Sequence, residues 1–269
     1  MVGLQRNNIS STLYKVKPKK RLGQHFLKDL NVAKKITDSL SPGTVNLIEI
    51  GPGTGVLTQF LSDAYFPGLY LIEIDDESVE FLKKQFPILA ERIIHTDFLS
   101  CDLKRLFSGD ISIIGNFPYN ISSQILFKVL ECRSQVKEVV GMFQKEVAER
   151  ICSPAGSKKY GILSVLLQSY YDIEYLFTVS EKTFYPEPKV KSAVIRLKRN
   201  KTVRLDCDEA FFIQLVKTAF NQRRKTLRNA LRKFEFRDQV KGSDIFDKRA
   251  EQLGVNDFVF LTKQIKTSL

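Results

Sequence analysis

The sequence predicts an α/β fold, with a Rossmann-like domain built on a mostly parallel β-sheet and a small all-α domain after it. Short apolar runs alternate with helical stretches as far as residue 173, which is typical of a parallel sheet covered by helices on both faces. The two segments that follow instead alternate apolar and polar residues. From Asp208 onward the pattern is helical. These three observations together predict the fold.

The first half of the chain begins with a predicted helix over residues 28–40, which ends at Ser41-Pro42-Gly43. Further helices are expected to start near Thr54 and Val79. Between the helices lie apolar runs that predict parallel strands, because a strand buried on both faces is apolar throughout. These runs are residues 45–50, 69–74, 92–95, 111–115 and 136–143.

The second half of the chain changes character. Residues 173–180 and 192–198 alternate apolar and polar side chains, which predicts edge or antiparallel strands. Between them, "FYPEPKV" is too rich in proline for regular structure. Helices are then predicted at residues 210–220, 226–234 and 249–253. A charged stretch near residue 200 predicts a boundary between a domain of residues 1–200 and a second of residues 201–269.

Composition favours a polyanionic partner. The chain carries 42 Lys and Arg against 30 Asp and Glu, a net charge of +12, while 43% hydrophobic residues argue against disorder. The first 21 residues hold six basic residues and no acid. They resemble either an organellar presequence or an arm that contacts phosphates, and the clustering of charge near residue 20 favours the arm.

The location and the metal content follow from what the sequence lacks. No apolar run is long enough to cross a membrane, and no hydrophobic signal core begins the chain. We therefore expect a cytoplasmic protein with no membrane partner. The four cysteines are widely spaced and match no zinc or redox motif, so we expect reduced thiols and no metal site.

A nucleoside site is predicted where the first three strands end. Gly51, Gly53 and Gly55 follow the first strand, where glycine lets the backbone approach a ligand closely. Glu73 ends the second strand and would accept hydrogen bonds from both ribose hydroxyls. Asp97 follows the third strand and would bind an adenine amine, with the backbone of Phe98 as a neighbouring donor. The alternative for Asp97 is a helix cap.

The nucleoside is predicted to be S-adenosylmethionine. The third glycine comes one residue too early for a dinucleotide fingerprint, and the sequence has no second phosphate-binding motif. S-adenosylmethionine carries no pyrophosphate and needs no such motif. Glu49, just before the loop, would suit its cationic end.

The stretch Asn116-Phe117-Pro118-Tyr119, at the end of the fourth strand, predicts methyl transfer to an adenine amine. That amine is a poor nucleophile, because its lone pair is delocalised into the ring. The Asn116 side-chain oxygen and the Phe117 carbonyl would accept both amine hydrogens and aim the lone pair at the methyl donor. Pro118 would fix the direction of the loop. Tyr119 would stack on the flipped base. The structural alternative is a β-turn with buried aromatics.

These motifs make the sequence resemble the ribosomal RNA adenine N6-dimethyltransferases. The Asn-Phe-Pro-Tyr stretch resembles the family's N-[LIV]-P-Y motif, and the match covers nearly the whole chain in the family's order. It is nearest to the bacterial branch, which dimethylates two adjacent adenosines near the 3′ end of small-subunit ribosomal RNA. The other matching segments are "KKRLGQHFL", "EIGPGTGVLT", "MFQKEVAERI", "FYPEPKVKSAVIRL" and "FNQRRKTLRNAL".

The resemblance implies further site residues. It adds His25 and Leu27 to the methyl-donor site of Gly51, Glu73, Asp97 and Asn116, and it makes Phe184 the aromatic that covers the other face of the target base. His25 stands where many relatives have asparagine, and its structural alternative is a histidine that caps a helix near Asp29. Phe117 replaces the more usual leucine, a change that should be tolerated because the role belongs to its backbone carbonyl.

A basic stretch in the C-terminal part predicts RNA binding. Residues 221–237 carry seven basic residues against one acid. Arg224, Arg228 and Arg232 are spaced to share one face of a helix, which favours phosphate contact over an ordinary solvated surface. The residues expected to contact RNA are Arg223, Arg224, Lys225, Arg228 and Arg232.

The expected function is dimethylation of small-subunit rRNA within an immature 30S particle, by a protein expected to be monomeric. Three alternatives stay open at this point. The first is an adenine methyltransferase of the resistance type that acts on large-subunit RNA, or one that acts on DNA. The second is a non-catalytic ribosome-assembly or transcription factor on the same fold. The third is a small-molecule methyltransferase, which would have no evident use for the basic stretch.

Overall fold

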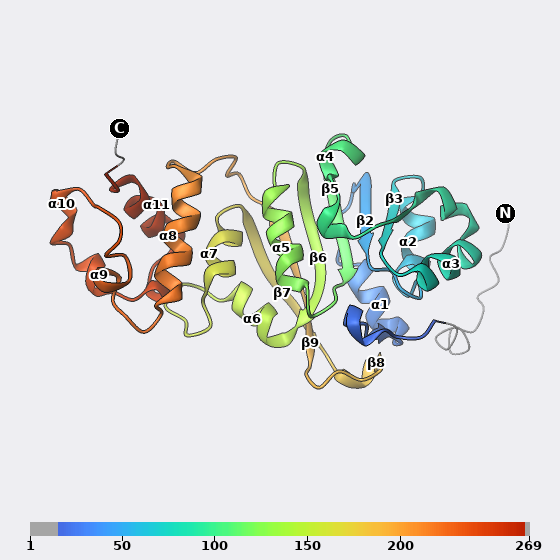
Figure 1. The fold of residues 1–269 in the computed structure, drawn as a ribbon. Helices are drawn as coiled ribbons and strands as arrows, with labels where there is room; N and C mark the ends of the chain where they lie inside the picture. Colours follow the sequence, from blue (N-terminus) through green and yellow to red (C-terminus); the bar gives the residue numbers. More distant parts are fainter. Residues whose placement is uncertain (1–15, 267–269) are drawn as a thin grey trace. The chain divides into compact units, whose positions relative to one another are not determined.

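The computed structural model describes residues 16–266 of the chain (Figure 1). It divides into two compact units. The first contains the chain up to Ala148 together with Tyr175–Lys198, and the second contains Glu149–Glu174 and the chain from Arg199 onward. Residues 149–174, which the sequence assigned to the first domain, thus group with the C-terminal helices, because α7 (Ile162–Gln168) packs on α8 (Glu209–Asn221).

A seven-stranded sheet forms the centre of the first unit, in the order β4-β3-β2-β5-β6-β9-β7. The pairs β2–β3, β3–β4, β2–β5 and β5–β6 are parallel, and β9 is antiparallel to β6. All seven predicted strands are present. Their bounds are β2 Asn46–Ile50, β3 Leu69–Glu73, β4 Ile93–His95, β5 Ile111–Asn116, β6 Val136–Gln144, β7 Tyr171–Val179 and β9 Ser192–Arg199.

The strand order reverses between β2 and β5. The chain runs outward from β2 to β4 and then returns to place β5 on the other side of β2. In open α/β sheets, ligands bind outside the carboxyl ends of the strands at such a reversal. The topology therefore directs attention to the loops after β2, β3, β4 and β5.

The helices lie mostly where the apolar spacing predicts them. The α-helices are α1 Leu30–Thr37, α2 Thr58–Tyr65, α3 Asp76–Gln85, α4 Leu103–Leu106, α5 Ser122–Glu131, α6 Lys145–Cys152, α7, α8, α9 Leu227–Ala230, α10 Asp238–Lys241 and α11 Val255–Lys263. Two starts were misplaced: α2 begins at Thr58 rather than near Thr54, and α3 begins at Asp76 rather than near Val79. Gly51, Gly53 and Gly55 all have positive φ angles, and this conformation delays the first helical turn.

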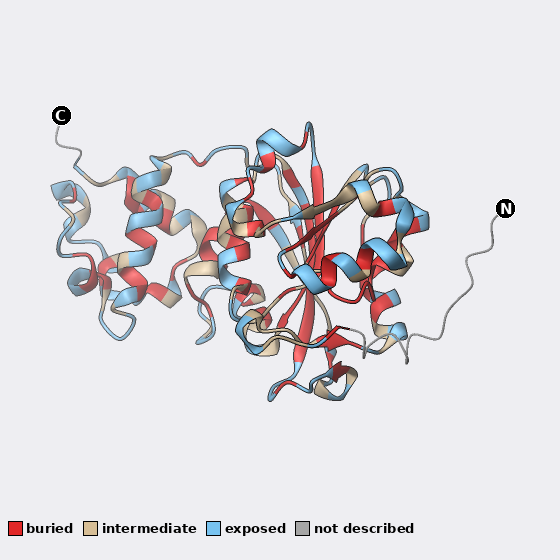
Figure 2. Cartoon of the chain, turned by 45° about the vertical axis from the view of Figure 1, so that its right-hand side comes forward, coloured by how far each residue is buried: buried red, intermediate tan, exposed pale blue. Residues whose placement is uncertain are grey.

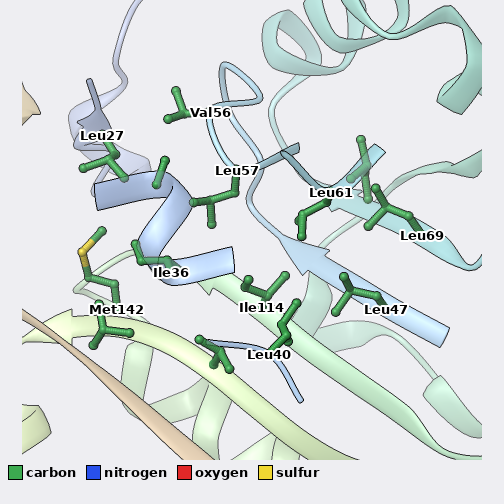
Figure 3. Close-up of a cluster of buried hydrophobic side chains, with 14 of the residues drawn as sticks. Leu27, Ile36, Leu40, Leu47, Val56, Leu57, Leu61, Leu69, Ile114 and Met142 are labelled. Atoms are coloured by element: carbon green, nitrogen blue, oxygen red, sulfur yellow. The ribbon is translucent and has the colours of Figure 1, made fainter. Parts of the chain in front are cut away.

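The main apolar core lies between the sheet and helices α1 and α2 (Figure 3). Leu47, Leu69 and Ile114 from the strands meet Ile36 of α1 and Leu61 of α2, and each of these side chains is fully buried. Figure 3 also shows Leu27 within this cluster. The core fixes the strands whose ends form the cavity described below.

A second, two-stranded sheet pairs β1 (Phe26–Leu27) with β8 (Phe184–Tyr185). The sequence analysis expected no regular structure in "FYPEPKV", and this expectation was wrong for its first two residues. Strands of two residues are too short to produce an alternating pattern. The pairing joins the N-terminal segment to the chain just before β9.

The second unit is helical. Helices α7, α8 and α11 pack together through buried faces (Figure 2). Phe212 and Phe258 on these faces are fully enclosed. The predicted helix over residues 226–234 is wrong, because α9 covers only Leu227–Ala230. Thr226 precedes the helix and forms a β-bridge with Arg249. The helix stops after Ala230, because Leu231 has a non-helical backbone with φ −101° and ψ 11°.

No helix within residues 16–266 is long and apolar enough to cross a membrane. The same residues contain no cluster of three or more histidine, cysteine, aspartate or glutamate side chains that could hold a metal ion. The part of the expected basic arm before residue 16 lies outside the described residues.

Candidate active site

A cavity of about 220 Å³ lies in the first unit at the carboxyl ends of β2, β3, β4 and β5, and residues 21–26 form one of its walls. We call it the strand-end cavity. It brings together ten of the predicted site residues, which are His25, Gly51, Gly53, Glu73, Asp97, Phe98, Asn116, Phe117, Pro118 and Tyr119. Leu27, Glu49 and Phe184 do not line it.

The loop after β2 gives the cavity an open backbone wall. Gly51 has a φ of +63°, and a Cβ atom there would meet nothing within 4 Å. At Gly53, with a φ of +55°, a Cβ would lie 2.8 Å from the ring of Phe26. Glycine therefore leaves space for a ligand at the first position and allows the N-terminal segment to pack closely at the second.

Glu73 ends β3 and organises this loop. Its Oε2 accepts a hydrogen bond from the Gly53 N–H at 3.0 Å, and its Oε1 accepts from the Ile74 and Asp75 N–H groups, each at 2.9 Å. Burial raises the pKa of Glu73, and the three N–H donors partly oppose that rise. Because a carboxylate has about four acceptor positions, Glu73 retains acceptor capacity for a ligand hydroxyl.

Asp97 follows β4 and has two roles. Its Oδ1 accepts from the Leu99 N–H at 2.9 Å and caps a short 3-10 helix over Phe98–Ser100. The helix cap that the sequence analysis weighed as an alternative is therefore present, in a residue that also lines the cavity. Phe98 beside it is buried.

Asn116 ends β5, and its amide has a fixed orientation. Its Nδ2 donates to the carbonyl oxygen of His25 at 2.8 Å. A carbonyl only accepts hydrogen bonds, so the amide nitrogen must face His25, and the side-chain oxygen Oδ1 is left as an acceptor. A residue 91 positions away in sequence thus sets which atom Asn116 offers.

The side chain of Phe117 anchors the next residue of the motif. Its ring is 1% exposed and packs edge-to-face on Phe143, with ring centroids 5.1 Å apart. Gly115 and Gly141 are register partners on β5 and β6, and a Cβ at either would lie within 2.6 Å of this ring. A slot made by two glycines, which we call the glycine slot, thus accommodates the Phe117 ring.

Tyr119 and His25 form a stacked pair beside Asn116. Their ring centroids are 5.4 Å apart and the planes differ by 26°. The Tyr119 hydroxyl is hydrogen-bonded to Ser192 Oγ at the start of β9, and burial raises the pKa of Tyr119. His25 Nδ1 lies 2.8 Å from the Pro186 carbonyl oxygen, so Nδ1 carries the proton in this bond.

The N-terminal wall is tied to the strand ends. Lys19 forms an ion pair with Asp75, whose side chain is 1% exposed and which follows Glu73 closely in the chain. Gly23 has a φ of +62°, and a Cβ there would lie 2.5 Å from the Asn120 side-chain oxygen. The wall therefore contacts both the β3 loop and the β5 loop.

Three predicted site residues belong to the interior instead. Leu27 and Phe184 are 3% and 0% exposed and pack in the main core. In this structure the Phe184 ring is not available to a base, and the neighbouring Tyr185 is the exposed aromatic, at 43%. Their pairing between β1 and β8, which was not predicted, turns both side chains inward.

Glu49 lies between β2 and α2 rather than on the cavity wall. It is 1% exposed, and Oε2 accepts a hydrogen bond from Thr58 Oγ1 at 2.7 Å. Burial raises the pKa of Glu49 to about 8. The carboxyl is therefore largely protonated near neutral pH, which weakens the case for it as the partner of a cation.

The cavity also contains residues that the sequence analysis missed. Ile74 is 49% exposed although it is apolar, and it lines the cavity next to Glu73. Ile50, Ile72 and Leu99 add further apolar surface. Ile50 and Ile72 could have been predicted from the sequence, because they lie near the carboxyl ends of predicted parallel strands, the edge of the sheet where ligands bind.

These residues fit S-adenosylmethionine. Ile74, Leu99 and Phe98 offer apolar contact for an adenine ring, and Glu73 offers acceptors for ribose hydroxyls. Glu73 and Asp97 supply acidic groups beside a ligand that carries a positive charge. The space over Gly51 admits a close approach to backbone.

The predicted RNA-binding residues lie in the second unit and fall into two classes. Arg223 donates to the Lys158 carbonyl oxygen and pairs with Glu251, and Arg228 pairs with Asp247. Arg224, Lys225 and Arg232 are exposed, and their side chains have no hydrogen-bond or ion-pair partner among residues 16–266. Because α9 is short, the prediction that Arg224, Arg228 and Arg232 share one helix face is wrong.

Comparison with known proteins identifies the family of the chain. The ribosomal RNA adenine dimethylase family matches residues 15–263. Ribosomal RNA small subunit methyltransferase A of Cytophaga hutchinsonii is 56% identical over 253 residues, which cover 93% of this chain and 98% of that protein.

Solved structures show the same architecture. A dimethyladenosine transferase from Plasmodium falciparum has a TM-score of 0.73 at 26% identity, and the match covers 88% of this chain and 96% of the other. The 23S rRNA methyltransferase ErmE shares the fold, with a TM-score of 0.66 at 23% identity over 89% of this chain and all of the other. With the family match extending over almost its entire length, the chain belongs to the ribosomal RNA adenine dimethylase family.

Proposed function

We propose that this protein dimethylates N6 of two adjacent adenosines near the 3′ end of small-subunit ribosomal RNA. S-adenosylmethionine is the methyl donor and supplies an electrophilic methyl group on a sulfonium. The family match and the relative from Cytophaga hutchinsonii support this assignment. The fixed amide of Asn116 at the strand-end cavity is the observation on which the chemistry depends.

Asn116 and Phe117 prepare the target nitrogen. The Asn116 Oδ1 accepts one amine hydrogen, and the Phe117 backbone carbonyl accepts the other. Two acceptors draw the amine toward a tetrahedral shape, so that its lone pair points out of the ring plane at the methyl group. The hydrogen bond from Asn116 Nδ2 to His25 holds the side chain in this orientation before substrate arrives, which is preorganisation of the kind that lowers barriers.

Tyr119 receives the flipped base by stacking. Its hydroxyl contact with Ser192 holds the ring, and stacking contributes about 1–3 kcal/mol per base. His25 lies against the same tyrosine, so it borders the space that the base enters. Glu73 and Asp97 would hold the ribose and the adenine of the methyl donor on the other side of Asn116. After transfer, the proton that leaves N6 passes to water.

The test of this chemistry is Asn116→Ala. We expect transfer to fall by about 10²–10³-fold, the usual cost of one preorganised hydrogen-bonding group, while binding of 30S particles persists. Asn46→Ala is the matched control, because the Asn46 amide also donates to backbone carbonyls, those of Ser108 and Asp110, but lies at the opposite end of β2. Undiminished turnover by Asn116→Ala would contradict the role given to Asn116.

The substrate is tested separately. Isolated 30S particles and naked large-subunit RNA are offered with a labelled methyl donor, and the modified nucleotides are mapped by mass spectrometry. We expect two adjacent dimethyladenosines in the small-subunit RNA. Labelling confined to large-subunit RNA would overturn the assignment in favour of a resistance-type enzyme.

We further propose that the protein acts in the cytoplasm as a monomer. Sedimentation of the purified chain would check the oligomeric state.

A further inference from the structure

The second unit contains a pocket of about 230 Å³ that the chemistry above does not use. We call it the aromatic pocket. Leu227 and Leu231 contribute apolar surface from α9 and the residue that ends it. Phe236 and Phe246 pack edge-to-face, with ring centroids 4.9 Å apart, and both are 5% exposed. The pocket is therefore a rigid, apolar concavity.

Phe234 lines the same pocket but is only half-buried. Its ring centroid is 6.4 Å from that of Phe236, and the two planes differ by 54°. The ammonium group of Lys233 lies 5.2 Å from the Phe234 centroid. Phe234 is thus the most exposed of the three aromatic rings that line the pocket.

Cationic side chains surround this apolar surface. Arg228, Arg232 and Lys241 line the pocket. Arg228 is held in place by Asp247 Oδ1 at 2.9 Å and the Lys241 carbonyl at 3.0 Å. Arg232 is exposed and has no hydrogen-bond or ion-pair partner in the described part of the chain. Residues 222–241, which we call the basic segment, contain eight basic residues against two acids, Glu235 and Asp238.

We propose that the aromatic pocket binds one unpaired nucleobase of the RNA, stacked on Phe234, with the adjoining phosphate on Arg232. Aromatic rings beside free cations are how proteins hold unpaired nucleotides, because every base has a stacking face and every linkage has a charge. An apolar protein side chain would fill the same concavity but would not use the eight-to-two excess of positive charge. This inference rests on the proposed RNA-directed function and adds a second base-binding site to it.

The test is binding of fluorescein-labelled hexauridylate to the full-length protein by fluorescence anisotropy. Uracil is chosen because it lacks the adenine amine that the strand-end cavity would bind. A hexamer of abasic ribose phosphates serves as the control probe without bases. We expect wild type to prefer hexauridylate over the abasic probe and Phe234→Ala to lose about tenfold in affinity for hexauridylate only. Phe260→Ala is the matched control, since Phe260 on α11 is 43% exposed and does not line the pocket.

The salt dependence of binding distinguishes the contribution of the Phe234 ring from that of the Arg232 charge. Phe234→Ala should leave the slope of log affinity against log salt unchanged, whereas Arg232→Ala should reduce it by about 1. Should Phe234→Ala lose its cooperative thermal transition, Phe234→Leu keeps apolar volume and removes the ring, and the same selective loss is expected. Equal binding by Phe234→Ala, Phe260→Ala and wild type would overturn the inference, as would loss of the base preference in Tyr119→Ala alone.

Two further outcomes are distinct. Weaker binding of Phe234→Ala to 30S particles with unchanged binding to hexauridylate would mean that a ribosomal protein occupies the pocket, which refutes the nucleobase. Methylation of 30S particles by each variant is measured in parallel. If wild type fails to methylate them, the proposed function fails while the oligonucleotide result still decides the pocket.

Discussion

The strand-end cavity and the basic segment hold their polar groups in different ways. In the cavity, Asn116 and Glu73 are fixed by hydrogen bonds to backbone atoms from distant parts of the first unit. In the basic segment, Arg228 has acidic and carbonyl partners, while Arg232 is exposed to solvent. Fixed acceptors suit a reaction that depends on direction, and exposed cations suit a partner recognised by its charge.

The largest effect is expected from Glu73→Ala. The change removes the acceptor for three backbone N–H groups. In the proposed function it also removes the acceptor for the ribose of the donor. Because charge-assisted hydrogen bonds contribute about 1.5–3 kcal/mol each, affinity for S-adenosylmethionine should fall about a thousandfold. Calorimetric titration measures it, and Asp76→Ala, another acid after β3, is the control. An affinity within threefold of wild type would show that the fixed loop is not what binds the donor.

The second effect concerns the glycine slot. In Gly141→Ala the new Cβ would lie 2.4 Å from the Phe117 ring and 2.7 Å from Phe143. Overpacking of this kind lowers the free energy of unfolding by about 1–3 kcal/mol, and it should also displace the Asn116-Phe117 backbone. The double variant Gly141→Ala with Phe117→Leu should recover part of the loss, because it relieves the contact with residue 117 and leaves the contact with Phe143. Urea unfolding measures the free energy of unfolding of both variants. If the double variant were no more stable than Gly141→Ala, the glycine slot would not position the motif.

The third effect is a pH dependence from Glu49. Its pKa is raised by burial to about 8, so between about pH 4.5 and 8 the folded protein binds a proton that the unfolded chain has released. Stability therefore falls as pH rises through this window, by about 1 kcal/mol per pH unit. Glu49→Gln keeps an acceptor for Thr58 and removes the titration. The unfolding free energy of the variant should exceed that of wild type increasingly from pH 5 to 8, and parallel curves would refute the shift.

The smallest effect compares Arg228 with Arg232. Arg228→Ala removes an exposed ion pair with Asp247, so the free energy of unfolding should fall by about 0.2–1 kcal/mol. Arg232→Ala should leave stability unchanged and weaken RNA binding. Thermal unfolding and RNA titration of both variants check this contrast. If Arg228→Ala weakened RNA binding with no loss of stability, the distinction between the paired Arg228 and the unpaired Arg232 would be wrong.

Sequence patterns predicted what depends on a few neighbouring residues. Five short runs rich in apolar residues predicted the parallel strands, and the residues after them predicted most of the cavity, because carboxyl ends of parallel strands meet at one edge. Arg224, Arg228 and Arg232 have helical spacing, but spacing alone did not reveal that Thr226 forms a β-bridge with Arg249 or that α9 ends before Arg232. Nor could any local pattern show that Phe184 pairs with Leu27 and turns inward.

The contacts around His25 join residues that are made at very different times. The His25 carbonyl accepts a hydrogen bond from Asn116, and the His25 ring nitrogen binds the Pro186 carbonyl. Its stacking partner Tyr119 is hydrogen-bonded to Ser192. All of these partners are synthesised after His25. A chain synthesised from its N-terminus thus exposes residues 19–27 long before their partners have left the exit tunnel. Late, long-range closure of this kind slows folding. The nascent protein should therefore bind the methyl donor only after β9 has left the exit tunnel, when most of the chain has been translated.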